Sequence, residues 1–507
     1  MKCLSAILFA IMLFVARSHA EAPSHEAIER IRNLSIEGLN HAYNFEFDSA
    51  THSFDLASQI EPLHPRPYVG KVMILCWKVL LNRNEREVEA FSSLADRVVD
   101  AAEKYEERYG NDADARLCLG TIYGYRAFVH GRTKSYLKAA WDAKKSYDLF
   151  HEALNLDERT YDAYMGIGLF HYFLDFLPKP LQWIASLMGV SADAVSGIKE
   201  IRIAAEKGFF NKVEAQYYLA QFLPWMEGDF ESGERILAEL GSRYPSNSVV
   251  AFTRAVWDLG RNDVRSARDL LASIVEARND STDPVRAYAM YKLAECYFRL
   301  GMYRSARHWY LEFLARHKEE TYQATSSYRI GICYEMEEKR DTAMLHYKKA
   351  VNGDRKLGDD GYAARKAELR LRSSLHDADT LLLAAQNALR SGMYDAVITF
   401  ATALKAASGV SSDMILEADF LLAESLFEKK SYADALGTYR TIASRKIERE
   451  VWLHPWSHYQ SGLCLLKLSD IQGARKEFEK VLEYDEYDFR NWLDFRSKRE
   501  LEKMEKS

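Results

Sequence analysis

The sequence has 507 residues and a formal net charge of −6, so it allows two or more globular domains or one extended repeat array. With 48% hydrophobic residues and only 10 prolines, a largely disordered chain is excluded. No block of basic residues stands out, and therefore nothing points to nucleic acid or to an anionic membrane surface as a partner.

The first twenty residues predict an export signal. Lys2 precedes an apolar run, Leu4–Val15, which has the length of a signal-peptide core. Ser18-His19-Ala20 then places small residues at the two positions that a signal peptidase reads, and we expect cleavage after Ala20. The alternative is a membrane anchor, although the run is short for a full span. Export predicts a location in a periplasm, at the outer membrane or outside the cell.

Helical repeats are predicted for residues 21–210. Gly38 and Ala50, with Phe47 and Phe54, match a tetratricopeptide frame in which two small residues stand 12 positions apart. Residues 82–108 predict one long amphipathic helix, and a degenerate copy of the repeat follows over residues 146–169.

The stretch LPKPLQWIASLMG, Leu177–Gly189, matches no neighbouring pattern. Leu181, Ile184 and Met188 recur at helical spacing, which predicts an inserted apolar helix near 177–200. We do not expect it to span a membrane, because Pro178 breaks the apolar block. Packing in the core is the first interpretation. The alternative is an exposed contact patch for a partner or for lipid, with Trp183 as its contact residue.

Two groups of residues in the N-terminal half carry a resemblance to a known family. They are YNFEFDSA (Tyr43–Ala50) and the set Gly166, Gly168, Leu169, Phe170, His171, Leu177, Pro178, Gly189, Ser191, Gly197, Ile198 and Gly208. With these residues the chain resembles the tetratricopeptide repeat protein 39 group, which includes mitochondrial outer-membrane proteins of inclusion-body clearance and uncharacterised bacterial relatives. The resemblance implies a helical-repeat adaptor and supplies no catalytic residues, while the export signal departs from the mitochondrial members.

The clearest repeats lie in a central array, residues 211–350, and in a C-terminal array, residues 381–507. Each copy has two small residues 12 positions apart, one in each helix of a predicted hairpin. A small residue is needed where two helices cross closely, while large residues fill the space between hairpins. The pairs are Ala294 and Ala306, Gly331 and Ala343, Ala423 and Ala435, and Gly462 and Ala474.

Between these arrays, residues 351–380 predict a charged helical insertion. At the C-terminus, Trp492, Leu493 and Arg496 share one face of a predicted capping helix. The predicted fold is therefore all-α. It is a tetratricopeptide-type α-solenoid, a superhelix of antiparallel helix hairpins, with the inserted apolar helix and the C-terminal cap.

The sequence predicts no catalytic residue, no cofactor and no metal ligand. His454 and His458 have the spacing of a metal-binding pair, but His458 falls at a packing position of the repeat and no third ligand is evident. Five cysteines follow the leader: Cys76, Cys118, Cys296, Cys333 and Cys464. Cys296, Cys333 and Cys464 occupy the same position of the repeat and are predicted to be buried apolar side chains that form no bridge.

A concave groove lined by the first helix of each hairpin is the predicted binding surface. We expect it to be aromatic and weakly acidic, with Glu295, Glu335, Glu424 and Glu428 interspersed. For each ring, burial in the hairpin core is the alternative. The candidate contact residues are Tyr217, Phe252, Tyr288, Tyr291, Phe298, Tyr328, Phe420, Phe427, Trp456 and Tyr459, with Trp183 of the inserted helix.

The lysine and asparagine clamp of chaperone-tail binders is absent, since its places hold Tyr291, Glu295, Tyr328 and Ile332. A ligand with a bare C-terminal carboxylate is thus disfavoured, and an extended or helical segment with apolar anchors fits better.

Three functions follow from these patterns. The first is a non-catalytic, exported scaffold that holds protein partners in the groove. The second is an envelope- or lipid-associated assembly factor that touches a membrane through residues 177–189. The third is an enzyme with a site hidden between the halves of the chain. The partner's identity and the oligomeric state are left open by the sequence.

Overall fold

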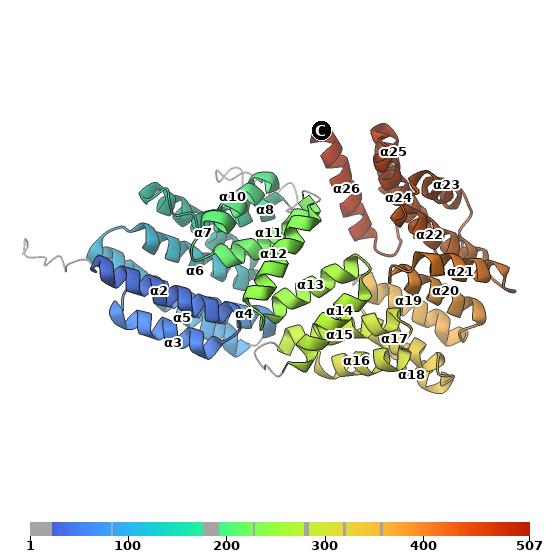
Figure 1. Cartoon of the computed structure of the whole chain (residues 1–507), viewed down its shortest axis with the longest axis horizontal. Coiled ribbons are helices and arrows are strands. Elements are labelled where there is room, and N and C mark those ends of the chain that lie inside the picture. The colour runs from blue at the N-terminus through green and yellow to red at the C-terminus, as the bar shows by residue number, and fades with distance from the viewer. Residues whose placement is uncertain are drawn as a thin grey trace, which may run out of the picture. The chain divides into compact units, whose positions relative to one another are not determined.

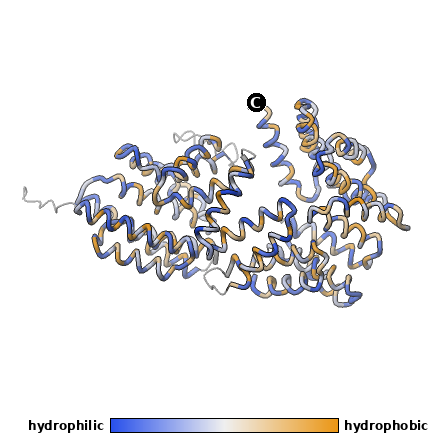
Figure 2. The backbone as a smooth tube through the Cα atoms, viewed as in Figure 1, coloured by the Kyte–Doolittle hydropathy of each residue, from blue (hydrophilic) through white to orange (hydrophobic). Residues whose placement is uncertain are grey.

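The computed structural model describes residues 23–82, 85–175, 192–226, 229–277, 283–317, 321–354 and 358–506. Within these ranges it contains 24 helices and no strand, which confirms the all-α prediction (Figure 1). Hydrophobic and hydrophilic residues alternate along most helices, as amphipathic packing requires (Figure 2). The chain divides into two compact units: unit 1 comprises Met1–Ala251 and Asn279–Asp283, and unit 2 comprises Phe252–Arg278 and Pro284–Ser507.

Unit 1 is built from helices that pack against their neighbours along the chain, as in α2 with α3, α6 with α7 and α8 with α10. The long helix predicted at residues 82–108 is present as α5. The helices are α2 (His25–Tyr43), α3 (Phe47–Ile60), α4 (Arg66–Asn82), α5 (Glu85–Tyr109), α6 (Ala113–Arg132), α7 (Tyr136–Leu156), α8 (Ala163–Asp175), α10 (Ala194–Lys207), α11 (Lys212–Met226) and α12 (Phe230–Arg243).

Two glycines set the crossing of α8 and α10. A Cβ atom on Gly168 would lie 2.5 Å from the Gly197 carbonyl oxygen, and one on Gly197 would lie 2.6 Å from that of Gly168. Only glycine allows backbones to approach this closely. Next to the crossing, Asp162 accepts hydrogen bonds from the backbone N–H groups of Phe209 (2.9 Å) and Asn211 (2.7 Å). The residues of the family resemblance that the structure describes here therefore serve packing.

Unit 2 continues the same construction. Helix α13 (Ser248–Gly260) runs across the unit boundary, and the residues from Phe252 onward belong to unit 2. The other helices are α14 (Val264–Glu276), α15 (Asp283–Arg299), α16 (Tyr303–Arg316), α17 (Gln323–Glu335), α18 (Arg340–Val351), α19 (Gly358–Arg372), α20 (Asp377–Leu389), α21 (Tyr394–Ala406), α22 (Ser412–Glu428), α23 (Tyr432–Ala443), α24 (Leu453–Lys467), α25 (Ile471–Val481) and α26 (Arg490–Lys506).

The small residues of the repeat frame are buried at helix crossings, as predicted. A Cβ atom on Gly462 would lie 2.6 Å from the ring of Phe478, and one on Gly38 would lie 2.5 Å from the ring of Phe54. In both cases the ring stands 16 residues after the small residue, in the second helix of the hairpin. Each first helix thus receives one large ring from the second.

The structure bears on some of the remaining sequence predictions and leaves others open. The charged segment 351–380 contains α19, which packs against α17 and α18. The predicted cap is α26, whose Leu493 is fully buried. The leader, residues 1–20, and the stretch 177–189 with Trp183 lie outside the described residues. The domain limits proposed from sequence stay predictions.

The five cysteines after the leader are all buried and free, which confirms the prediction of burial made for Cys296, Cys333 and Cys464. Within the described ranges, no helix combines the length and the hydropathy needed to cross a membrane.

Ala294 tests the hairpin frame because its side chain is fully buried where α15 meets α16. We expect Ala294→Leu to overpack this crossing and lower the free energy of unfolding by about 1–3 kcal/mol. Chemical denaturation monitored by circular dichroism measures the change. The matched control is Ala315→Leu, an exposed site on the neighbouring α16. Equal stability of the two variants would contradict the frame.

Candidate functional site

The aromatic residues predicted to line the groove fall into two groups. Four are buried in hairpin cores, with exposed fractions of 1–6%: Tyr291, Phe298, Phe420 and Tyr459. The Tyr291 ring, for example, stacks on Tyr322 at a centroid distance of 4.3 Å. For these four, the alternative of burial in the hairpin core is the one that the structure supports. They cannot present a face to a partner without local unfolding.

The other described rings are partly exposed, so their role as contact residues stays a prediction. Tyr217 belongs to unit 1 and the rest to unit 2. They are Tyr217, Phe252, Tyr288, Tyr328, Phe427 and Trp456.

A group of charged side chains meets between α15, α17, α19 and the end of α20, all within unit 2 (Figure 1). We call it the inner cluster. Backbone and side-chain contacts hold the end of α20 against the end of α15, since Asn387 donates from Nδ2 to the Phe298 carbonyl at 3.1 Å. The inner cluster consists of Lys292, Glu295, Arg299, Arg329, Asp359 and Arg390.

Glu295 is the most strongly perturbed carboxylate of the inner cluster. Its Oε2 atom lies 3.3 Å from Lys292 Nζ and 3.8 Å from Arg299 Nη2. Burial raises the pKa of Glu295, but the four surrounding cations outweigh burial and hold the pKa at about 2. Glu295 is therefore ionised throughout the physiological range.

Positive charge exceeds negative charge in the inner cluster, with four cations against the two carboxylates of Glu295 and Asp359. Arg329 lies over the Phe298 ring, with 4.4 Å from its guanidinium carbon to the ring centroid. Within the described part of the chain, the side chains of Arg329 and Arg390 form no hydrogen bond and no ion pair, while the Arg390 carbonyl oxygen accepts a hydrogen bond from Arg299 Nη1 at 3.5 Å. The Arg299 Nε atom is also buried without a hydrogen-bond partner there.

The pKa of Arg390 shows the consequence of this excess of positive charge. Its side chain is open to solvent, yet the enclosing helices and the like charges of Arg299 and Arg329 lower its pKa. Glu295 offsets this only in part. An anion placed among these three guanidiniums would relieve their mutual repulsion and could accept hydrogen bonds from them.

A second charged group in unit 2 is fully paired and gives a contrast. Glu450 accepts hydrogen bonds from Arg365 Nη2 at 3.1 Å and from Lys366 Nζ at 2.8 Å, and Trp452 Nε1 donates to it at 2.9 Å. Burial raises the pKa of Glu450, but Lys366 and Arg365 outweigh it and bring it to about 2. This group fixes α19 to the segment before α24, and it has no surplus charge to offer a ligand.

The groove was predicted to be weakly acidic, and this prediction is wrong at three of its four glutamates. Glu295 is surrounded by cations. Glu335 forms an ion pair with Arg340 and accepts a hydrogen bond from the Tyr347 hydroxyl at 2.7 Å. Glu424 accepts a hydrogen bond from the Tyr439 hydroxyl, and burial raises its pKa to about 7.

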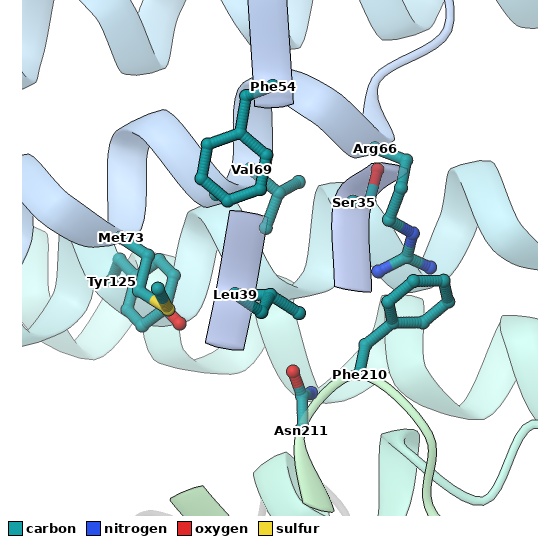
Figure 3. Close-up of a pocket in the computed structure, with 10 residues that line it drawn as sticks. Ser35, Leu39, Phe54, Arg66, Val69, Met73, Tyr125, Phe210 and Asn211 are labelled. Atoms are coloured by element: carbon teal, nitrogen blue, oxygen red, sulfur yellow. The ribbon is translucent and has the colours of Figure 1, made fainter. Parts of the chain in front are cut away.

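Unit 1 contains a small cavity of about 20 Å³ beside Arg66, large enough for one water molecule. Arg66 is buried and pairs with Asp114. Its guanidinium carbon lies 3.6 Å from the centroid of the Phe210 ring, and Figure 3 shows these two side chains next to each other. The Ser35 hydroxyl is buried without a hydrogen-bond partner in the described part of the chain. The cavity is too small for an organic ligand.

The two histidines at metal spacing have protein partners. His458 Nδ1 lies 2.6 Å from Glu477 Oε2, and His454 Nε2 lies 2.8 Å from the Arg445 carbonyl oxygen. No group of three residues able to hold a metal ion occurs where side chains are described.

Helix hairpins that meet at small residues, repeated along both units, define a tetratricopeptide-type repeat protein. The model of the family described as Iml2/Tetratricopeptide repeat protein 39 matches residues 80–370, more than half of the chain. The chain belongs to this family. A comparison with curated protein sequences finds no match.

Among solved structures, the chain is similar to yeast Tom70, with 14% identity, 89% of this chain and 92% of that chain covered, and a TM-score of 0.31. It is similar to c5321, a protective antigen with an SLR fold from uropathogenic Escherichia coli, at 14% identity, with 81% and 86% covered and a TM-score of 0.34. The apo quorum sensor NprR from B. thuringiensis follows at 14%, with 82% and 98% covered and a TM-score of 0.28. Matches this distant say nothing about function.

The raised pKa of Glu424 makes a pH-dependent prediction. A carboxyl group whose pKa is higher in the folded chain favours folding below its unfolded pKa, and this contribution is lost as pH rises through about 7. We therefore expect Glu424→Gln, which keeps an acceptor for Tyr439, to stabilise the protein at pH 8 by about 1–3 kcal/mol. Little change is expected near pH 4.

Thermal unfolding at both pH values measures this effect. The control is Glu428→Gln, one turn further along α22 and exposed, which should change stability equally little at either pH. A pH-independent effect of Glu424→Gln would show that burial does not raise the pKa of the Glu424 carboxyl group.

Proposed function

We propose that this protein is an exported, non-catalytic repeat scaffold that holds an acidic segment of a protein partner on the inner cluster of unit 2. The observation that supports this most is the surplus of cations there, with Arg329 and Arg390 unpaired within the described part of the chain. Membership of a tetratricopeptide repeat family supports the broader role of protein–protein interaction.

The chemistry of the inner cluster favours carboxylate groups as ligands. Guanidinium groups bind carboxylates with two parallel hydrogen bonds, and such bonds are stronger where surrounding helices limit the access of water. Tyr328 precedes Arg329 on α17 and is partly exposed, so an apolar side chain of the same partner would have a contact beside the charge. An extended or helical segment with both acidic and apolar residues fits these features.

The cations of the inner cluster do not stand at the clamp positions that chaperone-tail binders use, because they occupy different places in the repeat. Lys292 and Arg329 each follow a residue that occupies a clamp position, Tyr291 and Tyr328. We therefore propose acidic side chains as ligands, and a bare C-terminal carboxylate stays disfavoured.

Loss of the two unpaired guanidiniums tests the binding face. We expect Arg329→Gln/Arg390→Gln to fold normally, because it removes like-charge repulsion, and to weaken partner capture about tenfold or more. Crosslinked pulldown from the native envelope measures capture. The matched control is Arg304→Gln/Arg372→Gln, two exposed arginines of the same unit.

Two outcomes of the pulldown decide whether the inner cluster is the binding face. A partner that is lost from the inner-cluster variant and retained by the control supports the proposed face. A full set of partners on both variants would mean that proteins bind elsewhere on the chain.

Export is a separate part of the proposal and rests on the leader pattern of residues 1–20. N-terminal sequencing of the native protein is expected to begin at Glu21. Native protein that keeps Met1 in a soluble cytoplasmic fraction would contradict export while leaving the binding face untouched. Membrane contact through residues 177–189 remains a prediction from sequence.

A further inference from the structure

The start of α7 in unit 1 exposes large apolar side chains to solvent (Figure 1). The exposed fractions are 68% for Tyr136, 91% for Leu137 and 74% for Trp141. Single exposed apolar residues are common on proteins, but three within two turns of one helix form a patch that usually marks a contact surface. We call these three residues the α7 face.

The three residues of the α7 face are not required for the packing of α7 against its neighbours. Helix α7 packs through the opposite side, where Ser146, Leu149, Phe150 and Ala153 are buried. Leu137 and Trp141 are four residues apart and therefore lie together on the outward side of the helix. The outer side of α7 is thus apolar at its N-terminal end, while the side chains that pack against the fold lie further along the helix.

Two neighbouring helices add rings near this end of α7. Phe128 on α6 and Phe173 on α8 are 38% and 43% exposed, and their ring centroids lie 6.3 Å apart in an edge-to-face contact. Helix α6 ends at Arg132, only four residues before α7 begins, and α8 packs against α7. The neighbouring helices α6, α7 and α8 thus each carry exposed apolar side chains.

The charges around the α7 face are positive. Residues 132–145 contain five basic residues and one acidic residue, a net charge of +4 in a chain of net charge −6. The single acid, Asp142, is buried and accepts a hydrogen bond from Arg126 Nε at 3.1 Å. Lys134, Lys138 and Lys145 form no ion pair with any described residue. The flanks of the apolar patch are therefore cationic and free to meet an anionic surface.

We propose that the α7 face docks unit 1 on a lipid bilayer with anionic headgroups. Tryptophan and tyrosine favour the boundary between headgroups and acyl chains, a bare leucine gains by entering it, and flanking lysines are attracted to anionic lipid. The combination favours a membrane surface over a protein partner, because protein interfaces are depleted in lysine. The contact is peripheral and reversible, and it lies on a different unit from the inner cluster.

Vesicle binding of the chain that begins at Glu21 tests the proposal, since this chain keeps every described residue and lacks the apolar leader. The probes are vesicles of phosphatidylcholine alone and vesicles with roughly one third phosphatidylglycerol. We expect binding to the anionic vesicles, a loss of about tenfold in Leu137→Ser/Trp141→Ser, and a weaker preference for anionic lipid in Lys138→Gln/Lys145→Gln. Leu156→Ser, an exposed site at the other end of α7, is the control.

A fluorescent label locates the contact. The five cysteines of this chain are buried, so a polarity-sensitive dye will react with an introduced Leu137→Cys alone. Its emission is expected to shift to the blue on anionic vesicles, while the same dye at Leu156→Cys keeps its emission.

Three results would overturn the proposal. The first is no binding to anionic vesicles, or equal binding by the unsubstituted chain and Leu137→Ser/Trp141→Ser. The second is a dye at position 137 that is already shielded without vesicles, which would mean that the chain covers its own face. The third is shielding by an envelope protein fraction but not by vesicles, which would assign the face to a protein.

Discussion

The close crossing of two helices at a small residue is the constraint on which the rest of this structure depends. Where Gly462 and Gly331 stand, the space of a side chain is taken by the ring of Phe478 or Tyr347 from the second helix. Each hairpin is therefore a fixed unit, and stacking such units buries a continuous core without long-range pairing of the chain. Buried cysteine and alanine side chains occupy the remaining core positions where only a small side chain fits.

The stacking has an electrostatic consequence in unit 2. Lys292 and Arg390 are almost a hundred residues apart, yet the path of the hairpins brings the end of α20 onto the end of α15. Cations that would each be solvated on an isolated hairpin then share two carboxylates, Glu295 and Asp359. Gathering like charges costs free energy unless an anion joins them, and for that reason an arrangement with unpaired guanidiniums is better explained by binding than by stability.

The sequence alone was sufficient to predict where the repeats lie, but it was insufficient to predict which side chains lie on the surface. Offsets of 12 between small residues are local, so Ala294, Gly331 and Gly462 were predicted to be buried and are. Whether a ring faces the groove or the core depends on the crossing angle of its hairpin, and so Tyr291 and Tyr459 could not be assigned. The inner cluster escaped prediction because its members are joined by the superhelical path. The exposure of Leu137 and Trp141 was equally hidden, since their spacing resembles that of a buried stripe.

Family membership and binding specificity are carried by different residues in this protein. The glycines at the α8–α10 crossing and the carboxylate of Asp162 hold the backbone in place, and they offer nothing to a partner. The inner cluster and the α7 face lie outside that set, on surfaces that a solenoid leaves free once its hairpins are packed. A relative could keep the crossing and replace both surfaces without loss of fold. Membership of the family therefore accounts for how the chain folds, while the two proposed contacts rest on the charges of unit 2 and the apolar end of α7.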